Sequence, residues 1–267
     1  MNCDNAKRNL VSSITNDFIN GSITITQNAL EGLLHIIKIC PGISQNEFFE
    51  LLDEIKKAKP TMQALRNILE IIENKIVTNR SMTIDRILFE TIQDLQRAKE
   101  LTISKAMRFV LTNFKNRELS ILTTSYSSTI NKFLENLANL KKIQLWVLKS
   151  QSREFDYSNQ TFKKALDLGM HSQVVEESQL INYSSKIDFA VSGADCISLG
   201  GGIVNGTSTL SMAQFCFRHK IPYFVIAESI KFGKDCIVED GFDLIPMNLV
   251  SGIFTDVVFT QEQGIVD

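Results

Sequence analysis

The feature that most constrains the fold is a change in the spacing of apolar residues near residue 117. Before this point, apolar side chains recur every three or four residues, which is the period of a helix with one buried face. After it, short apolar runs alternate with helical segments, a pattern typical of strand–helix–strand units. The sequence therefore predicts a helical N-terminal domain over residues 1–115 and an α/β domain over residues 116–267.

The N-terminal part should consist of several amphipathic helices. The apolar spacing predicts one helix over residues 28–40, and Ser44 and Glu47 have the spacing of a capping box at the start of the next. Pro60 suits the first turn of a third helix, because proline lacks the N–H that would be unpaired there. Two more helices are expected, over residues 83–100 and 102–114.

The C-terminal part should contain a parallel sheet. Five strands are expected, over residues 119–123, 143–148, 173–175, 187–191 and 223–226. Helices are expected between them, over residues 129–140, 161–168, 179–184 and 210–218. Strands of this kind are buried on both faces, and right-handed crossovers place the connecting helices on both sides of the sheet.

Polar residues and glycines follow four of the predicted strands. The segments are residues 123–127, 150–153, 193–195 with 200–202, and 227–229. Parallel sheets bind ligands at the carboxyl ends of their strands, where helix N-termini expose N–H groups. If the fold is correct, these segments share one crevice.

Two common functional interpretations of these segments lack their required residues. The first is nucleotide binding by the glycine-rich stretch over residues 200–206. This stretch is neither GxGxxG nor followed by GKS or GKT, and glycines there also permit a tight turn. Ser125 with His171 or His219 would suggest a hydrolase. However, Ser125 lacks the Gly-x-Ser-x-Gly turn that exposes a nucleophile.

Charge and hydropathy narrow the possible partners. The chain has 28 basic and 30 acidic residues, which disfavours a broad basic surface for nucleic acid or an anionic membrane. Residues 1–10 do not resemble a signal peptide, and no apolar run approaches the ~20 residues that span a bilayer. Proteins or small molecules are therefore the expected partners.

The five cysteines are odd in number, widely scattered and without a CxxC pair. They are Cys3, Cys40, Cys196, Cys216 and Cys236. This pattern favours reduced thiols in the cytoplasm over a disulfide framework or a zinc site. We therefore expect neither disulfides nor a metal or other cofactor.

Several segments, in order along the chain, resemble the motifs of one superfamily. They are residues 121–127 (ILTTSYS), 191–195 (VSGAD), 201–205 (GGIVN), 227–232 (AESIKF), and 242–249 (FDLIPMNL) with 254–256 (FTD). The superfamily contains methylthioribose-1-phosphate isomerase, ribose-1,5-bisphosphate isomerase and the α, β and δ regulatory subunits of eukaryotic translation initiation factor 2B. The resemblance implies a phosphosugar-isomerase-like, Rossmann-like α/β domain behind a helical N-terminal domain.

The resemblance also implies which isomerase groups this chain retains. The general acid/base Asp matches Asp195, and Asn205 is retained. Ser125 stands where the isomerases have a catalytic Cys, and Gln151 and Gly206 stand where they have an Arg and a Lys. A serine hydroxyl is far less acidic than a thiol, so these five positions are expected to form a vestigial pocket without catalysis.

A chain of this kind resembles the regulatory subunits of the exchange factor, the β subunit most closely and the α subunit next. The resemblance implies partners: the other subunits and initiation factor 2, whose guanine-nucleotide exchange and phosphorylation they govern. Apolar interface candidates are Phe232, Ile237, Pro246, Leu249 and Phe254. Two alternatives remain: an aldose–ketose isomerase of a phosphorylated pentose, and a pocket that binds a sugar phosphate or nucleotide without turnover.

Overall fold

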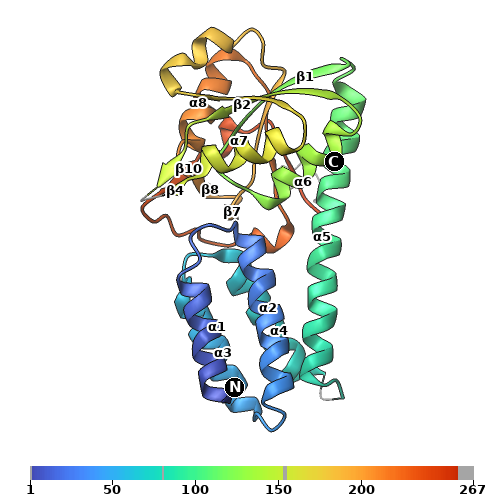
Figure 1. The fold of residues 1–267 in the computed structure, drawn as a ribbon, viewed down its shortest axis with the longest axis vertical. Coiled ribbons are helices and arrows are strands. Elements are labelled where there is room, and N and C mark those ends of the chain that lie inside the picture. The colour runs from blue at the N-terminus through green and yellow to red at the C-terminus, as the bar shows by residue number, and fades with distance from the viewer. Residues whose placement is uncertain (1, 80, 153–154, 258–267) are drawn as a thin grey trace. The chain divides into compact units, whose positions relative to one another are not determined.

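The computed structural model describes residues 2–79, 81–152 and 155–257 (Figure 1). The chain divides into two compact units, before and after the Arg97–Ala98 peptide bond. This division lies inside helix α5 (Ile84–Asn113), whereas the sequence pattern placed a domain boundary at residue 115. The second half of α5 belongs to the α/β unit because its apolar residues, including Ile103 and Val110, pack on the sheet.

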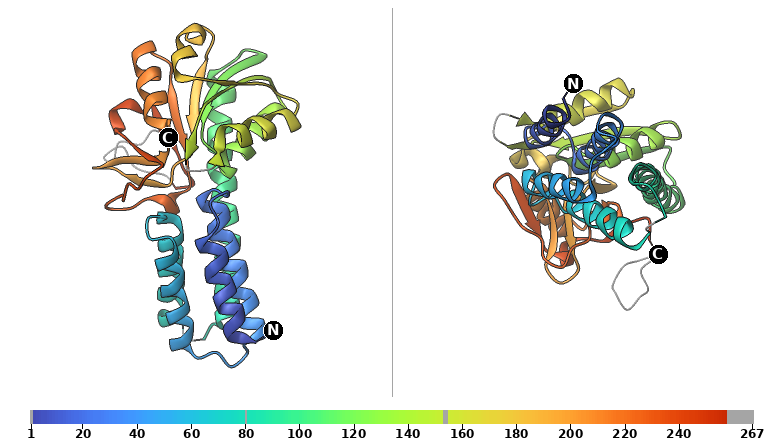
Figure 2. Two further views of the ribbon diagram at one scale, coloured as in Figure 1. Left: turned by 60° about the vertical axis from the view of Figure 1, so that its left-hand side comes forward. Right: turned by 90° about the horizontal axis from the view of Figure 1, so that it is seen from below.

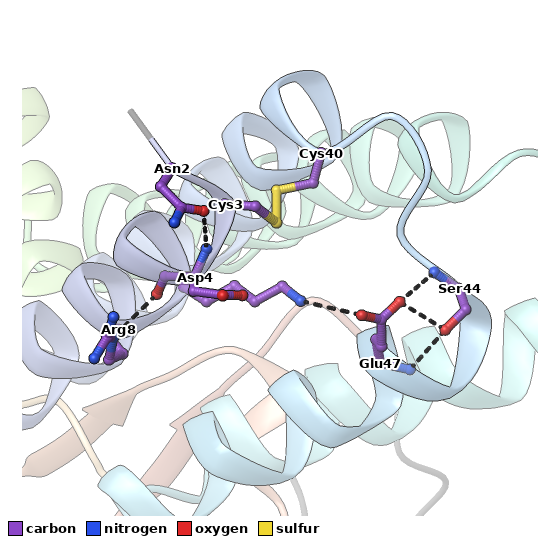
Figure 3. The surroundings of a disulfide bond; sticks show 8 residues. Asn2, Cys3, Asp4, Arg8, Cys40, Ser44 and Glu47 are labelled. Atoms are coloured by element: carbon purple, nitrogen blue, oxygen red, sulfur yellow. Dashed lines mark hydrogen bonds and ion pairs between the residues drawn. A yellow bond between two sulfur atoms is a disulfide. The ribbon is translucent and has the colours of Figure 1, made fainter.

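The N-terminal unit is helical, as predicted. Its helices are α1 (Cys3–Thr15), α2 (Ser22–Ile39), α3 (Gln45–Ala58), α4 (Gln63–Thr78) and the first part of α5. The predicted capping box is present at the start of α3 (Figure 3). The hydroxyl of Ser44 accepts from the backbone N–H of Glu47 at 3.3 Å, and Glu47 Oε2 accepts from the N–H of Ser44 at 2.9 Å.

Three details of the N-terminal prediction were wrong. Helix α2 begins at Ser22 rather than at residue 28. Pro60 precedes α4 instead of lying in its first turn, because Met62 is the N-cap. The two helices expected over residues 83–114 form the single helix α5, since no glycine or proline between residues 98 and 104 ends it.

The C-terminal unit contains the predicted parallel sheet. Its strand order is β11-β9-β6-β1-β2-β5, and all five pairings are parallel. The strands are β1 (Glu118–Thr124), β2 (Lys142–Leu148), β5 (His171–Val175), β6 (Phe189–Ser192), β9 (Tyr223–Ile226) and β11 (Gly252–Phe254). The edge strand β11 was not predicted, because three residues carry too little pattern to mark a strand.

Helices cover both faces of this sheet, which gives three layers (Figure 2). Helices α6 (Ser128–Ala138) and α7 (Tyr157–Asp167) join the second half of α5 on one face, and α8 (Thr209–His219) lies on the other. Strand β9 shows the alternation: Tyr223 and Val225 belong to the core on the α8 side, and Phe224 and Ile226 to the opposite core. The segment expected as a helix over residues 179–184 is the 3-10 helix η1 (Glu177–Tyr183).

A second, antiparallel sheet was not predicted. It has the order β10-β8-β7, with β7 (Cys196–Ser198), β8 (Gly202–Gly206) and β10 (Phe242–Ile245). The glycine-rich stretch interpreted as a loop therefore contains β8. Glycine is required at Gly202, where φ is 108° and a Cβ would lie 2.7 Å from the carbonyl oxygen of Ile245. The remaining elements are the short strands β3 (Gln151–Ser152) and β4 (Phe155–Asp156) and the 3-10 helices η2 (Ser229–Lys231) and η3 (Met247–Leu249).

The expectation of reduced thiols was wrong for four of the five cysteines. Disulfides join Cys3 to Cys40 (Figure 3) and Cys196 to Cys236, and Cys216 is free and buried. The paired cysteines are 37 and 40 residues apart in sequence, and in each pair the Cα atoms lie 5.7 Å apart. That distance is typical of disulfides, but only the tertiary fold creates it, so spacing along the chain gave no signal.

Candidate functional site

The strand order places a topological switch point between β1 and β6. From β1 the chain proceeds to β2 and β5 on one side, and then returns to β6, β9 and β11 on the other. In sheets of this kind the ligand crevice lies outside the carboxyl ends of the strands at the switch point. Ser125 follows β1 and Asp195 follows β6. Two of the site residues expected from the sequence therefore come after the two strands that flank the switch point.

Ser125 forms a constrained turn at the end of β1. Its φ is 62°, the left-handed region that residues other than glycine rarely adopt. Its carbonyl oxygen accepts a hydrogen bond of 2.5 Å from the hydroxyl of Thr161 on α7. A Cβ added to Gly206 would lie 2.5 Å from Ser125 Oγ. Ser125 and Gly206 therefore lie against each other, and a side chain at position 206 requires Ser125 to move.

Asn205 holds the beginning of α8. It is buried, and its side-chain amide donates to the hydroxyl of Thr209 at 2.9 Å. The same hydroxyl donates to the carbonyl oxygen of Gly206 at 2.6 Å. Asp195 is half-buried, and its backbone N–H donates to the carbonyl oxygen of Val204 at 2.8 Å. Asp195 and Asn205 therefore both have roles in holding the segments around β8.

Four of the five expected pocket residues gather around β8. Asn205 and Gly206 belong to this strand, Ser125 lies against it, and Asp195 is hydrogen-bonded to it. The side chain of Gln151 is exposed at the start of β3. Its neighbour Ser150 connects the segment after β2 to β8, because its hydroxyl donates to the carbonyl oxygen of Thr207 at 2.8 Å. We call the five expected pocket residues, Ser125, Gln151, Asp195, Asn205 and Gly206, the β8 corner.

A second group of polar residues lies beyond strand β9, where the sequence placed residues 227–229 in the predicted crevice without naming any of them as a site residue. Glu228, two residues beyond β9, has no exposed surface. Its Oε1 accepts a hydrogen bond of 2.6 Å from the hydroxyl of Thr129 on α6. Its Oε2 lies 3.4 Å from the ammonium group of Lys231, whose side chain is 3% exposed. The signal in the sequence is a Glu and a Lys three residues apart directly after a strand.

Lys99 and Asp256 extend this group. Lys99 on α5 donates to the hydroxyl of Ser128 at 3.3 Å. Partial burial lowers the pKa of Lys99, the nearby Glu228 opposes that change, and the positive charge of Lys231 adds to it. Asp256, beyond β11, accepts hydrogen bonds from the backbone N–H of Ser229 at 2.6 Å and from its hydroxyl at 2.7 Å. We call Glu228, Lys231, Lys99, Thr129 and Asp256 the β9 corner.

The predicted interface residues differ in exposure. Ile237 is 50% exposed and Pro246 is exposed, while Phe232 and Leu249 are half-buried against the core on the α8 side. Phe254, the remaining interface candidate, is buried. It is 9% exposed, because its ring packs at 5.1 Å from that of Phe109 and 5.6 Å from that of Phe224.

Two other features are absent from the part of the chain that the structure describes. Among residues 2–79, 81–152 and 155–257, no three His, Cys, Asp or Glu side chains gather as a metal site. No helix in the same part of the chain is both long enough and apolar enough to cross a membrane.

A helical unit followed by a six-stranded parallel sheet with helices on both faces defines the class of Rossmann-like α/β proteins. Residues 18–241 match the Initiation factor 2 subunit family. The chain belongs to that family. This finding agrees with the resemblance of the motifs between residues 121 and 256.

Relatives in this family carry two kinds of name. A Pyrococcus horikoshii protein named translation initiation factor eIF-2B subunit 2-like is 25% identical, over 90% of this chain and 90% of the relative. The ribose 1,5-bisphosphate isomerase of Methanocaldococcus jannaschii is 21% identical, over 94% of this chain and 90% of the relative. The relatives of this chain therefore carry the names of a translation-factor subunit and of an isomerase.

Solved structures support the fold. A crystal structure of translation initiation factor eIF-2B from Pyrococcus horikoshii has a TM-score of 0.77 and 22% identity, and 94% of each chain is covered. A chain of the tetrameric eIF2B-beta2-delta2 complex from C. thermophilum has a TM-score of 0.73 and 14% identity, over 96% of this chain and 90% of that one. At these identities the likeness establishes the architecture alone.

Proposed function

We propose that this chain is a non-catalytic regulatory subunit of an initiation factor 2B-type guanine-nucleotide exchange complex. It supports GDP/GTP exchange on initiation factor 2 and responds to phosphorylation of that factor. The subunit type it resembles most is β, followed by α. Its partners are the other subunits of the complex and initiation factor 2, and the shared surface includes the exposed Ile237 and Pro246.

The observation that carries this proposal is the composition of the β8 corner. Ser125 lies against Gly206 and accepts from Thr161, and neither neighbour is a base that could activate its hydroxyl. Isomerisation of a sugar phosphate needs two groups that move protons at neighbouring carbons and cations that hold the phosphate. Asp195 could supply one of the proton-moving groups, whereas Gln151 and Gly206 supply no positive charge.

The second candidate function is aldose–ketose isomerisation of a phosphorylated pentose. It is favoured by the retained Asp195 and by the lysines of the β9 corner, Lys99 and Lys231, at the same edge of the sheet. The similarity to a ribose 1,5-bisphosphate isomerase over most of the chain also supports it. A third candidate, ligand binding without turnover, uses the same residues.

The purified chain should be assayed with ribose-1,5-bisphosphate and with methylthioribose-1-phosphate. We expect no turnover of either, and calorimetry with both compounds tests binding without turnover. Turnover that Asp195→Asn abolishes, and that the exposed control Asp167→Asn leaves intact, would establish the isomerase instead.

Association should be tested by affinity capture of the full chain from its native organism. We expect recovery of other initiation factor 2B subunits and of initiation factor 2. Replacing the exposed Ile237 by Asp should reduce that recovery, while replacing the exposed Phe217 on α8 by Asp provides a control at another exposed apolar residue. Isolation of the chain as a free homodimer would contradict the proposal.

A further inference from the structure

The disulfide between Cys196 and Cys236 joins a regular element to an irregular one. Cys196 is the first residue of β7 and is 1% exposed. Cys236 is half-buried and lies between η2 and β10, in a segment over residues 233–241 that forms no helix or strand. We call residues 233–241 the linker segment.

The linker segment is fixed at both ends. At its beginning, the backbone N–H of Gly233 donates to the carbonyl oxygen of Ile197 at 2.9 Å. The hydroxyl of Ser198 donates to the carbonyl oxygen of Lys234 at 2.8 Å. At its end, the carbonyl oxygen of Gly241 accepts from the N–H of Thr207 at 2.9 Å. Between these ends the disulfide attaches the segment to β7.

Most side chains in the middle of the linker segment are exposed. Ile237 and Val238 are among the exposed apolar residues of the α/β unit, and Lys234 and Asp235 are exposed as well. A segment with few buried contacts opens at low free-energy cost, so a covalent attachment in its middle strongly affects its order. The half-buried Cys236 supplies that attachment.

The disulfide is also connected to the β8 corner. Cys196 directly follows Asp195, and Gly241 is hydrogen-bonded to Thr207, the neighbour of Gly206. A change in the order of the linker segment therefore reaches both sides of the candidate site as well as the exposed Ile237.

We propose that Cys196 and Cys236 are a reversible thiol–disulfide switch that orders the linker segment beside the candidate site. This inference goes beyond the proposed function, because it holds whichever activity the site has. The oxidant is a low-molecular-weight disulfide, RSSR. The net reaction converts two protein thiols and RSSR into the protein disulfide and two RSH, so two electrons pass from the protein to RSSR.

Exposure sets the order of the two exchange steps. The thiolate of Cys236, the more accessible sulfur, attacks RSSR, forms a mixed disulfide and releases RS⁻. The thiolate of Cys196 then attacks the sulfur of Cys236, forms the protein disulfide and releases the second RS⁻. The two thiol protons end on the two RS⁻ groups. Cys216 does not compete, because burial raises the pKa of its thiol to about 12.

The Cys3–Cys40 disulfide is the matched control. It joins the first residue of α1 to the C-cap of α2, two helices whose own hydrogen bonds and buried residues remain when it is reduced (Figure 3). The tests should use the full chain carrying Cys3→Ser and Cys40→Ser, so that Cys196 and Cys236 are the reactive pair under study.

The first test is reaction with oxidised and reduced glutathione, followed by alkylation and mass spectrometry. We expect the Cys196–Cys236 bond to form and to be reversed. Cys196→Ser should trap one glutathione on Cys236, whereas Cys236→Ser should take up none because Cys196 is buried. Alkylation of both Cys196 and Cys236 in the variant without Cys3 and Cys40 after treatment with oxidised glutathione would overturn the proposal.

The second test is limited proteolysis with trypsin at Lys234. Reduction, or the Cys236→Ser change at a half-exposed position, should accelerate this cleavage by about tenfold, since the linker segment then opens more often. Reduction should accelerate cleavage equally in the wild type, which also loses the Cys3–Cys40 bond, and in the variant without Cys3 and Cys40. A cleavage rate at Lys234 that is the same in oxidised and reduced protein would show that the disulfide does not order the segment.

Discussion

The β8 corner and the β9 corner both contain residues that follow the carboxyl ends of the parallel strands, but they differ in charge and burial. At the β8 corner, Ser125, Gln151 and Gly206 carry no charge. At the β9 corner, Glu228 and Lys231 are almost completely removed from solvent and paired with each other. The β9 corner therefore contains a buried ion pair, whereas these three residues of the β8 corner carry no charge.

The physical cost of losing each group explains this difference. An exposed residue such as Gln151, or a glycine such as Gly206, can replace a charged side chain without leaving a buried charge unpaired. Removing one partner of a buried ion pair leaves the other without compensation, which typically costs about 3–5 kcal/mol. The presence of Glu228 and Lys231 is thus explained by the fold, and by itself it is weak support for isomerase activity.

The largest effect should follow from Glu228→Gln. The change keeps the size of the side chain but leaves the ammonium group of Lys231 buried and unpaired, so we expect a loss of about 3–5 kcal/mol in the free energy of unfolding. Urea denaturation at pH 7 measures it. Adding Lys231→Met to Glu228→Gln should recover most of the loss, because neither charge of the buried pair then remains.

A matched control for Glu228→Gln is Glu135→Gln on α6. Glu135 pairs with Lys132 at 2.8 Å, but both side chains are substantially exposed. Exposed pairs of this kind contribute little to stability. Equal losses in the two variants would remove the distinction between a buried, structural corner and the rest of the surface.

An intermediate effect is expected from Gly206→Ala in the β8 corner. The new Cβ would lie 2.5 Å from Ser125 Oγ, and overpacking of this kind costs about 1–2 kcal/mol. Ser125→Ala removes the hydroxyl, so the double variant should recover about 1 kcal/mol, measured as a double-mutant coupling energy. Gly252→Ala on β11 is the control, because its Cβ would make an ordinary contact of 3.5 Å with Phe224.

A coupling energy near zero would mean that the hydroxyl of Ser125 moves away from position 206 at little cost. In that case a cationic side chain could be accommodated at position 206. The β8 corner would then lack a charge without lacking the room for one, which would strengthen the isomerase and ligand-binding alternatives.

The parallel sheet could be predicted because its main strands carry their own local signal. The apolar runs in β1, β2 and β9 are buried on both faces of the sheet, so each stands out from its polar surroundings. The antiparallel sheet could not be predicted in this way. Its strands are short, and β8 contains glycines whose strand conformation depends on pairing with β7 and β10.

The candidate site divides in the same manner. Ser125 and Asp195 could be predicted because they directly follow strands that the pattern identifies. The environment of Glu228 could not, because its hydrogen bond to Thr129 joins residues 99 positions apart. The two disulfides depend equally on tertiary contacts. The sequence pattern therefore predicts which residues follow the strands, whereas their hydrogen-bond and disulfide partners are known only from the tertiary structure.

The smallest effect concerns Lys99, the half-buried lysine of the β9 corner. Burial lowers its pKa in the folded protein below the unfolded value of 10.5, although Glu228 opposes the change. Below the folded pKa, Lys99 is charged in both states and the folded protein bears the full cost of burying that charge. As the pH rises from the folded pKa toward the unfolded one, the folded protein releases the proton first and this cost disappears.

Lys99→Met should therefore be more stable than the wild type at pH 7, and its advantage should shrink as the pH approaches about 10. Parallel urea denaturation series of the two proteins measure this difference, and the exposed Lys163→Met on α7 controls for the loss of one positive charge. A wild type that is more stable than Lys99→Met at pH 7 would show that attraction to Glu228 outweighs burial. Lys99 would then belong with Lys231 as a charge that stabilises the fold, and the β9 corner would be fully compensated.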